Sequence, residues 1–149
     1  MLRLQRTNSD DPSFHQLVQL LDKELWAQYE EEMKNYAPHN KIEDNKNVVI
    51  AYLNDSAVGC GCFKKFDEMS VEIKRMFVEK SFRGKRIGEA VLKELEHWAK
   101  ESSYSFTVLE TGTKQVEAIR LYERCGYLRT ENYGPYVDLQ YSVCMRKEL

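Results

Sequence analysis

The residues best suited to chemistry lie where an apolar strand ending at Val78 gives way to a predicted helix. The junction carries the basic turn Arg83-Gly84-Lys85-Arg86, followed by Ile87 and Gly88. Backbone N–H groups and the positive end of a helix converge at such a junction, so it favours an anion. Gly84 and Gly88 lack a Cβ, which lets a phosphate approach the backbone closely. A solvated basic turn is the alternative, because the spacing fits neither a P-loop nor a G-x-G-x-x-G fingerprint.

A second group of reactive side chains closes the last predicted helix, in Leu121-Tyr122-Glu123-Arg124-Cys125-Gly126-Tyr127. Tyr122 has a hydroxyl that can donate a proton, and Gly126 stands where the chain needs a left-handed residue. The alternative is an aromatic residue at the edge of the core beside an ordinary helix stop. Cys125 has no histidine near it in sequence, which disfavours a nucleophilic role.

The elements that position these residues follow from the apolar periodicity of the chain. Three strand-like runs between Val48 and Val78 are separated by short turns, which predicts an antiparallel meander. A further short helix and a loop are expected between Gln28 and Asn47. The other expected strands span residues 2–6, 106–109, 127–130 and 139–145, and the other expected helices span about 14–25, 87–101 and 113–124, the last capped by Thr113. These elements predict a mixed sheet.

Composition limits the classes of protein. The 149 residues, 42% of them hydrophobic, suffice for one domain over 1–149 with one core. A net charge of -2 argues against whole-surface binding to nucleic acid or to an anionic membrane, so neither partner is expected. No run approaches the roughly 20 apolar residues of a membrane span, and residues 1–6 lack the apolar core of a signal peptide. A cytoplasmic location is therefore expected.

The cysteines favour reduced thiols. Cys60, Cys62, Cys125 and Cys144 show no Cys-x-x-Cys spacing, and a domain of this size needs no disulfide framework. Cys60 and Cys62 would share one strand face, but no histidine lies near them in sequence. No metal site is expected.

Taken together, the two motifs resemble the GNAT superfamily of N-acetyltransferases. Its coenzyme motif R/Q-x-x-G-x-G/A is similar to Arg83-x-x-Arg86-x-Gly88, and its motif N-x-x-A-x-x-L-Y-x-x-x-G-F/Y is similar to Gln115-x-x-Ala118-x-x-Leu121-Tyr122-x-x-x-Gly126-Tyr127. The resemblance runs from about Val48 to the C-terminus. It implies an α/β (α+β) fold with a central mixed, mostly antiparallel sheet of about seven strands flanked by about four helices. Arg86 replaces a loop glycine; an arginine is tolerated there if its φ is negative, and its charge lies near phosphate.

The resemblance also implies direct attack of a substrate amine on the thioester of acetyl-coenzyme A. Glu72 and Glu110 occupy the strand positions from which family members draw a base, and either could take the proton of the ammonium. Both could instead pair with cations across the sheet. A backbone N–H near Met76 to Val78, which a bulge or splayed strand leaves without a ladder partner, could stabilise the oxyanion. Tyr122 could protonate the leaving thiolate. The residues expected at the coenzyme are Met76, Phe77, Val78, Arg83, Gly84, Lys85, Arg86, Ile87, Gly88, Gln115 and Tyr122.

In this family the first helices and the last strand pair wall the acceptor pocket. Tyr29, Tyr36 and Tyr133 are the expected substrate contacts, beside the acidic run 30–32, and this combination suits a cationic amine. A solvated acidic helix face is the alternative. We expect a small-molecule or peptide amine as acceptor and a monomer or homodimer. A non-enzymatic acyl-coenzyme A sensor and an interaction module on the same fold are the competing hypotheses.

Overall fold

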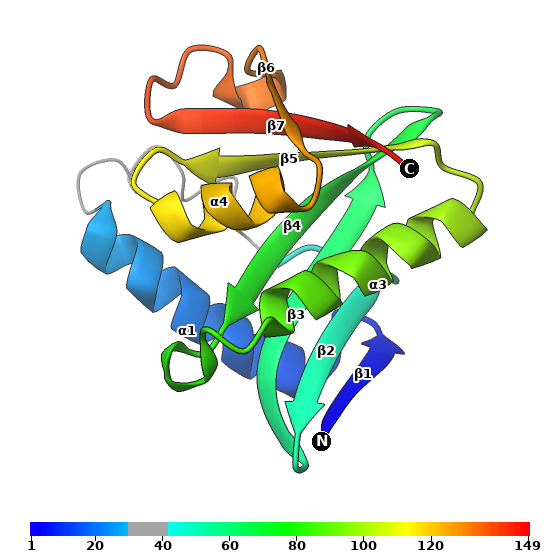
Figure 1. Ribbon diagram of the computed structural model, residues 1–149, viewed down its shortest axis with the longest axis vertical. Coiled ribbons are helices and arrows are strands. Elements are labelled where there is room, and N and C mark those ends of the chain that lie inside the picture. Colours follow the sequence, from blue (N-terminus) through cyan, green and yellow to red (C-terminus); the bar gives the residue numbers. More distant parts are fainter. Residues whose placement is uncertain (30–41) are drawn as a thin grey trace.

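A computed structural model describes residues 1–29 and 42–149, which are built around a seven-stranded sheet (Figure 1). The strands lie in the order β1-β2-β3-β4-β5-β7-β6. β4 and β5 run parallel, and every other neighbouring pair in that sheet is antiparallel. The predicted mixed, mostly antiparallel sheet is therefore confirmed. The strands are β1 (Leu2–Thr7), β2 (Val48–Leu53), β3 (Ser56–Lys65), β4 (Ser70–Val78), β5 (Phe106–Gly112), β6 (Leu128–Thr130) and β7 (Ser142–Glu148).

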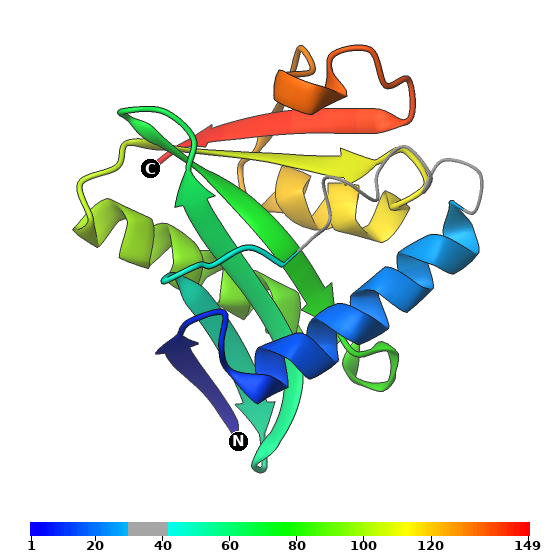
Figure 2. The ribbon, with the colours of Figure 1, turned by 180° about the vertical axis from the view of Figure 1, so that it is seen from behind.

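Within the described residues three α-helices cover the two faces of the sheet. α3 (Ile87–Glu101) and α4 (Val116–Arg124) pack on one face, and α1 (Pro12–Gln28) packs on the other (Figures 1 and 2). Strand side chains alternate between the faces. Val49 thus joins the core under α3, whereas Val48 joins the core under α1. The further helix expected between Gln28 and Asn47 falls mainly on residues 30–41, outside the described ranges.

Local signals explain where the helices begin and end. The Asp11 carboxylate accepts the N–H of Ser13 at 2.9 Å and caps α1, with Pro12 in the first turn. Gly126 follows α4 with φ +95°, as predicted. The predicted cap of α4 was wrong: Gln115 occupies the N-cap, because the N–H of Thr113 bonds the carbonyl of Tyr141 at 2.8 Å and stays in the loop.

The last strand pair differs from the prediction. β7 begins at Ser142 rather than at residue 139, because turns occupy residues 136–142. The N–H of Leu139 bonds the carbonyl of Tyr136 at 3.0 Å, and the N–H of Ser142 bonds the carbonyl of Leu139 at 3.1 Å. The Asn132 side chain donates to the carbonyls of Tyr136, Leu139 and Ser142 and holds this segment in place.

The sheet opens between β4 and β5. Their paired residues stop at Ile73 and Leu109, and beyond this point the strands diverge (Figure 1). On the other side of β4, two steps along β3 oppose three along β4, which is a β-bulge with Arg75 at φ +60°. The segment Met76 to Val78 therefore has β3 on one side and no paired strand on the other.

The four cysteines are free thiols, and Cys60, Cys62 and Cys144 are buried. Burial raises the pKa of Cys62 to about 12 and that of Cys144 to about 11, so both stay protonated near neutral pH. The prediction of reduced cysteines is confirmed. Across the two described ranges, the structure has no helix long and apolar enough to cross a membrane.

Candidate active site

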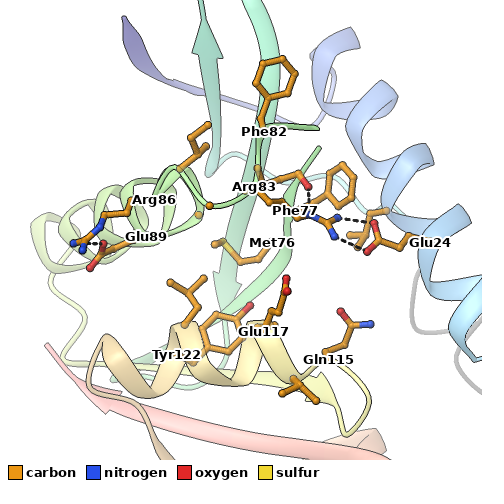
Figure 3. Close-up of a pocket in the computed structure, with 18 of the residues that line it drawn as sticks. Glu24, Met76, Phe77, Phe82, Arg83, Arg86, Glu89, Gln115, Glu117 and Tyr122 are labelled. Atoms are coloured by element: carbon orange, nitrogen blue, oxygen red, sulfur yellow. Dashed lines mark hydrogen bonds and ion pairs between the residues drawn. The ribbon is translucent and has the colours of Figure 1, made fainter. Parts of the chain in front are cut away.

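A cavity of about 900 Å³ occupies the opening beside the end of β4 (Figure 3). Its size lies within the range of ligand pockets. The end of β4, the loop into α3, one face of α4 and the second half of α1 form its walls. Ten of the eleven residues expected at the coenzyme line it: Met76, Phe77, Val78, Arg83, Gly84, Arg86, Ile87, Gly88, Gln115 and Tyr122. Lys85 does not; it lies on the exposed loop with its ammonium 5.7 Å from the centre of the Phe82 ring.

The loop into α3 fits an anionic group. Arg86 is the N-cap residue of α3 and makes no side-chain cap, so the first backbone N–H groups of the helix receive no side-chain acceptor from it. Gly84 has φ +82°, and the position that a Cβ would take is open space with no atom within 4 Å. Gly88 has a packing role as well, since a Cβ would lie 3.3 Å from Leu121. These features fit the pyrophosphate of a coenzyme A thioester.

The backbone of Arg86 differs from the expectation. Its φ is +62°, in the left-handed region, and not negative. The family glycine at this position has a physical reason, because a side chain in that region costs about 1 kcal/mol or more. The guanidinium of Arg86 is largely exposed and lies 3.9 Å from Glu89. Its charge is therefore available at the mouth of the cavity.

Arg83 is held by neighbours within the protein. Its two terminal nitrogens donate to the Glu24 carboxylate of α1 at 2.9 and 2.6 Å, and its Nε donates to the carbonyl of Val78 at 2.8 Å (Figure 3). No sequence pattern predicts this ion pair, because its members lie 59 residues apart.

A second cavity of about 130 Å³ adjoins the first and shares Met76, Gln115 and Tyr122 with it. Both predicted carboxylates, Glu72 and Glu110, line this second cavity. Glu72 is 6% exposed and accepts a hydrogen bond from Tyr133 at 2.8 Å. Glu110 accepts one from Ser142, also at 2.8 Å. The fold thus brings together the two candidate bases that lie 38 residues apart in sequence (110 − 72).

Tyr122 lies between the two cavities. Its side chain is buried, and no group in residues 1–29 or 42–149 forms a hydrogen bond with its hydroxyl. Burial, and secondly the charge of Glu110, raises the pKa of Tyr122 above its ordinary value. The hydroxyl therefore carries its proton at neutral pH and can donate it.

The expected acceptor contacts have three different outcomes. Tyr29 lines the second cavity, and its hydroxyl accepts the N–H of Lys114 at 2.6 Å. Tyr133 does not line it; this side chain lies behind Glu72 and holds the carboxylate. Tyr36 lies outside the described residues.

Tyr136 and Arg75 line the second cavity as well. The side chain of Tyr136 is buried, and this residue belongs to the region of the last strand pair, which was expected to wall the acceptor pocket. The guanidinium of Arg75 lies 3.1 Å from Asp22 of α1. A bulge or splayed strand was expected near Met76 to Val78, and the bulge lies directly before this segment, at Arg75.

Comparison with known proteins identifies the family. The model of the Acetyltransferase (GNAT) family matches residues 12–127. An IAA acetyltransferase of Azospirillum brasilense is 32% identical over 136 residues, which cover 90% of this chain and 89% of the relative.

Solved structures agree with this match. A Klebsiella pneumoniae structure described as an acyl-CoA N-acyltransferase has a TM-score of 0.82 at 28% identity and covers 100% of this chain and 98% of its own. A GNAT acetyltransferase of Elizabethkingia anophelis with acetyl-CoA bound shares the fold, with a TM-score of 0.71, 22% identity and coverage of 99% and 98%. The chain therefore belongs to the GNAT family and is an acetyl-CoA-dependent N-acetyltransferase.

Proposed function

We propose that this enzyme acetylates a primary amine of a small molecule or peptide, with Glu72 or Glu110 as general base and Tyr122 as general acid. One observation carries the proposal: both carboxylates and Tyr122 line the small cavity that adjoins the large one. A base and an acid with different proton affinities on two sides of one reacting centre are what acetyl transfer to an amine requires.

The large cavity is the proposed donor site. Acetyl-CoA supplies the acetyl group as a thioester. The first backbone N–H groups of α3 and the charge of Arg86 would hold its pyrophosphate, and the unpaired edge of β4 from Met76 to Val78 would run beside its thioester arm. Tyr122 faces the same space from α4, and Gln115 faces it from the N-cap of that helix (Figure 3).

The proton transfers follow from the residues. An alkylamine is protonated near pH 7, so Glu72 or Glu110 must take one proton before the nitrogen lone pair can form the new C–N bond. The C–S bond then breaks, and the sulfur takes the hydroxyl proton of Tyr122. Between these two steps the tetrahedral intermediate carries a negatively charged oxygen, and a backbone N–H of β4 near Met76 would stabilise it. The nitrogen of the new amide loses its second proton, and a proton from solvent restores the hydroxyl of Tyr122.

The acceptor is proposed to be cationic. Two carboxylates and the rings of Tyr29 and Tyr136 line the small cavity, and they offer charge pairing and cation–π contact to an ammonium group. Lys74 and Arg75 line it as well, and the charge of Arg75 is paired with Asp22. A cytoplasmic location and a monomeric or homodimeric state stay predictions from the sequence.

A panel of acceptor amines tests the proposal, with acetyl-CoA as donor and released thiol as readout. Tyr122→Phe, Glu72→Gln and Glu110→Gln are measured with a good acceptor. We expect Tyr122→Phe and one of the two glutamine variants to lower kcat by about 100-fold or more. Unchanged turnover in all three variants would remove the catalytic assignments.

A further inference from the structure

Arg83 opens the coenzyme motif, yet its guanidinium is bound by the protein itself. Two hydrogen bonds go to Glu24 and one to the carbonyl of Val78. The guanidinium carbon also lies 5.6 Å from the centre of the Phe77 ring. A guanidinium that makes a bidentate carboxylate pair and a further carbonyl bond has a fixed position.

Glu24 belongs to a helix that walls both cavities. Leu21 and Leu25 lie on either side of Glu24 in sequence. Both line the large cavity, here called the donor cavity, and the small second cavity, here called the acceptor cavity. Arg83 therefore connects this wall to the end of β4 and to the loop before α3. In the close-up, the pair spans the gap between α1 and that loop (Figure 3).

The charge of the pair argues against a phosphate contact. The carboxylate of Glu24 lies 2.6 Å from Arg83 and neutralises it. A phosphate that approached this guanidinium would also meet the negative charge of Glu24, whereas Arg86 is 87% exposed and lies 3.9 Å from its nearest carboxylate, Glu89. The first turn of α3 offers backbone N–H groups as well.

We propose that Arg83 is a positioning residue: through Glu24 it holds α1 across the cleft and sets the width of the donor and acceptor cavities, and it does not bind a coenzyme phosphate. The proposal rests on the donor site proposed above. A displaced α1 would loosen both cavities, so the effect extends to the acceptor and does not depend on the phosphates of the donor.

The test compares acetyl-CoA with acetyl-pantetheine, a thioester without the pyrophosphate. Glu24→Gln, Arg83→Gln and the double variant are assayed with both donors. We expect each single variant to raise the KM of both donors and of the acceptor by about three- to ten-fold. The double variant should be no worse than either single variant, because each removes the same link.

Glu94→Gln is the matched control. Glu94 pairs with Arg6 at 2.8 Å, and its exposure of 30% is close to the 33% of Glu24. Glu94 lines neither cavity. Its loss should leave the KM of both donors unchanged. Thermal unfolding of all variants is measured in parallel, and Glu24→Asp replaces Glu24→Gln should the latter not fold.

Two results would overturn the proposal. One is an Arg83→Gln variant that weakens acetyl-CoA and spares acetyl-pantetheine, since this is the pattern of a phosphate ligand. The other is a double variant whose rise in donor KM is the sum of the effects of the Glu24 and Arg83 single variants, or single variants that leave donor KM unchanged. A wild-type protein that consumes neither donor would instead remove the proposed function, and with it the positioning role.

Discussion

The hydroxyl of Tyr133 donates a hydrogen bond of 2.8 Å to Glu72, a carboxylate that is 6% exposed. The ring of Tyr133 in turn contacts the ring of Tyr136, with 5.7 Å between the centroids, and Tyr136 lines the acceptor cavity. One of the two candidate bases is thus held by an aromatic residue that does not line the small cavity. Tyr133 belongs to the site as a support for Glu72.

Tyr133→Phe tests this support. The change removes one hydrogen bond to a buried carboxylate, which is worth about 1 kcal/mol. If Glu72 is the base, kcat should fall by about three- to ten-fold. The same change in a Glu72→Gln background should have no further effect on kcat. An equal loss in both backgrounds would show that Tyr133 does not act through Glu72.

The pH dependence of Tyr122 follows from its burial. Burial raises the pKa of this hydroxyl above its ordinary value of 10, and the donor is the neutral form. The group therefore stays active as pH rises, and its loss of function begins only above about pH 10. We expect kcat to show no alkaline decline below that pH, measured with an acceptor that is saturating throughout.

Tyr122→Phe should lower kcat by about 100-fold at every pH below 10. Tyr127→Phe is the matched control. Its hydroxyl donates to Glu96 at 2.8 Å on the α3 side of the sheet, so its loss should lower stability and spare kcat. A Tyr122→Phe variant with unchanged kcat would mean that the thiolate leaves without this proton.

Much of the fold follows from local patterns. Apolar alternation and turn residues predicted β2, β3 and β4 within two residues, because each strand and its turn are close in sequence. The spacing of Ile87, Val91, Leu95 and Trp98 predicted α3 in the same way. The two motifs predicted most of the expected lining of the donor cavity, since the N-terminus of α3 and the end of α4 are themselves local structures.

Contacts between distant elements were not predictable. The pairing of Glu24 with Arg83, and of Tyr133 with Glu72, depends on how α1 and the last loop pack over the sheet. The bulge at Arg75 depends on the register of β3 with β4. No residue type at these positions requires such partners, so the supports of the site emerged only from the fold.

We predict that only glycine at position 112 leaves room for the side chain of Tyr29. A Cβ at Gly112 would stand 2.2 Å from the Tyr29 hydroxyl oxygen and 2.6 Å from its ring carbon Cζ. Gly112→Ala must therefore displace Tyr29 and break its bond to Lys114, at a cost of about 1–3 kcal/mol in the free energy of unfolding. Urea denaturation measures this.

The cost of Gly112→Ala has two contributions, the displacement of the Tyr29 ring and the loss of its hydrogen bond with Lys114, and Tyr29→Phe separates them. It removes the hydroxyl alone and should cost about 1 kcal/mol. Equal stability of Gly112→Ala and the wild type would show that Tyr29 moves aside without loss.

The cysteines should differ in reactivity. Burial raises the pKa of each thiol, but Cys125 is only partly buried, whereas Cys60, Cys62 and Cys144 are enclosed. A thiol reagent should therefore modify Cys125 first and the other three only on unfolding. Cys125→Ala should retain kcat within about two-fold, since the proposed attack by the amine is direct and needs no thiol. Loss of turnover in this variant would indicate a covalent acetyl-enzyme.

We expect Arg86 to lower the stability of the folded protein and to strengthen the binding of acetyl-CoA. Its φ of +62° is strained for a residue with a side chain, at about 1–2 kcal/mol. Arg86→Gly relieves this strain but adds about 0.5–1 kcal/mol of chain entropy to the unfolded state. The net gain should raise the unfolding temperature by about 1–4 °C. Arg86→Asn should behave alike, because asparagine tolerates the left-handed region.

Both changes remove the exposed charge at the mouth of the donor cavity, so the KM of acetyl-CoA should rise by several-fold while that of acetyl-pantetheine stays constant. Arg86→Lys keeps the charge and the strain, and it should change neither quantity. This pattern is the opposite of the one expected for Arg83, whose variants should weaken both donors. If Arg86→Asn left the KM of acetyl-CoA unchanged, the phosphates would be held by the backbone of α3 alone.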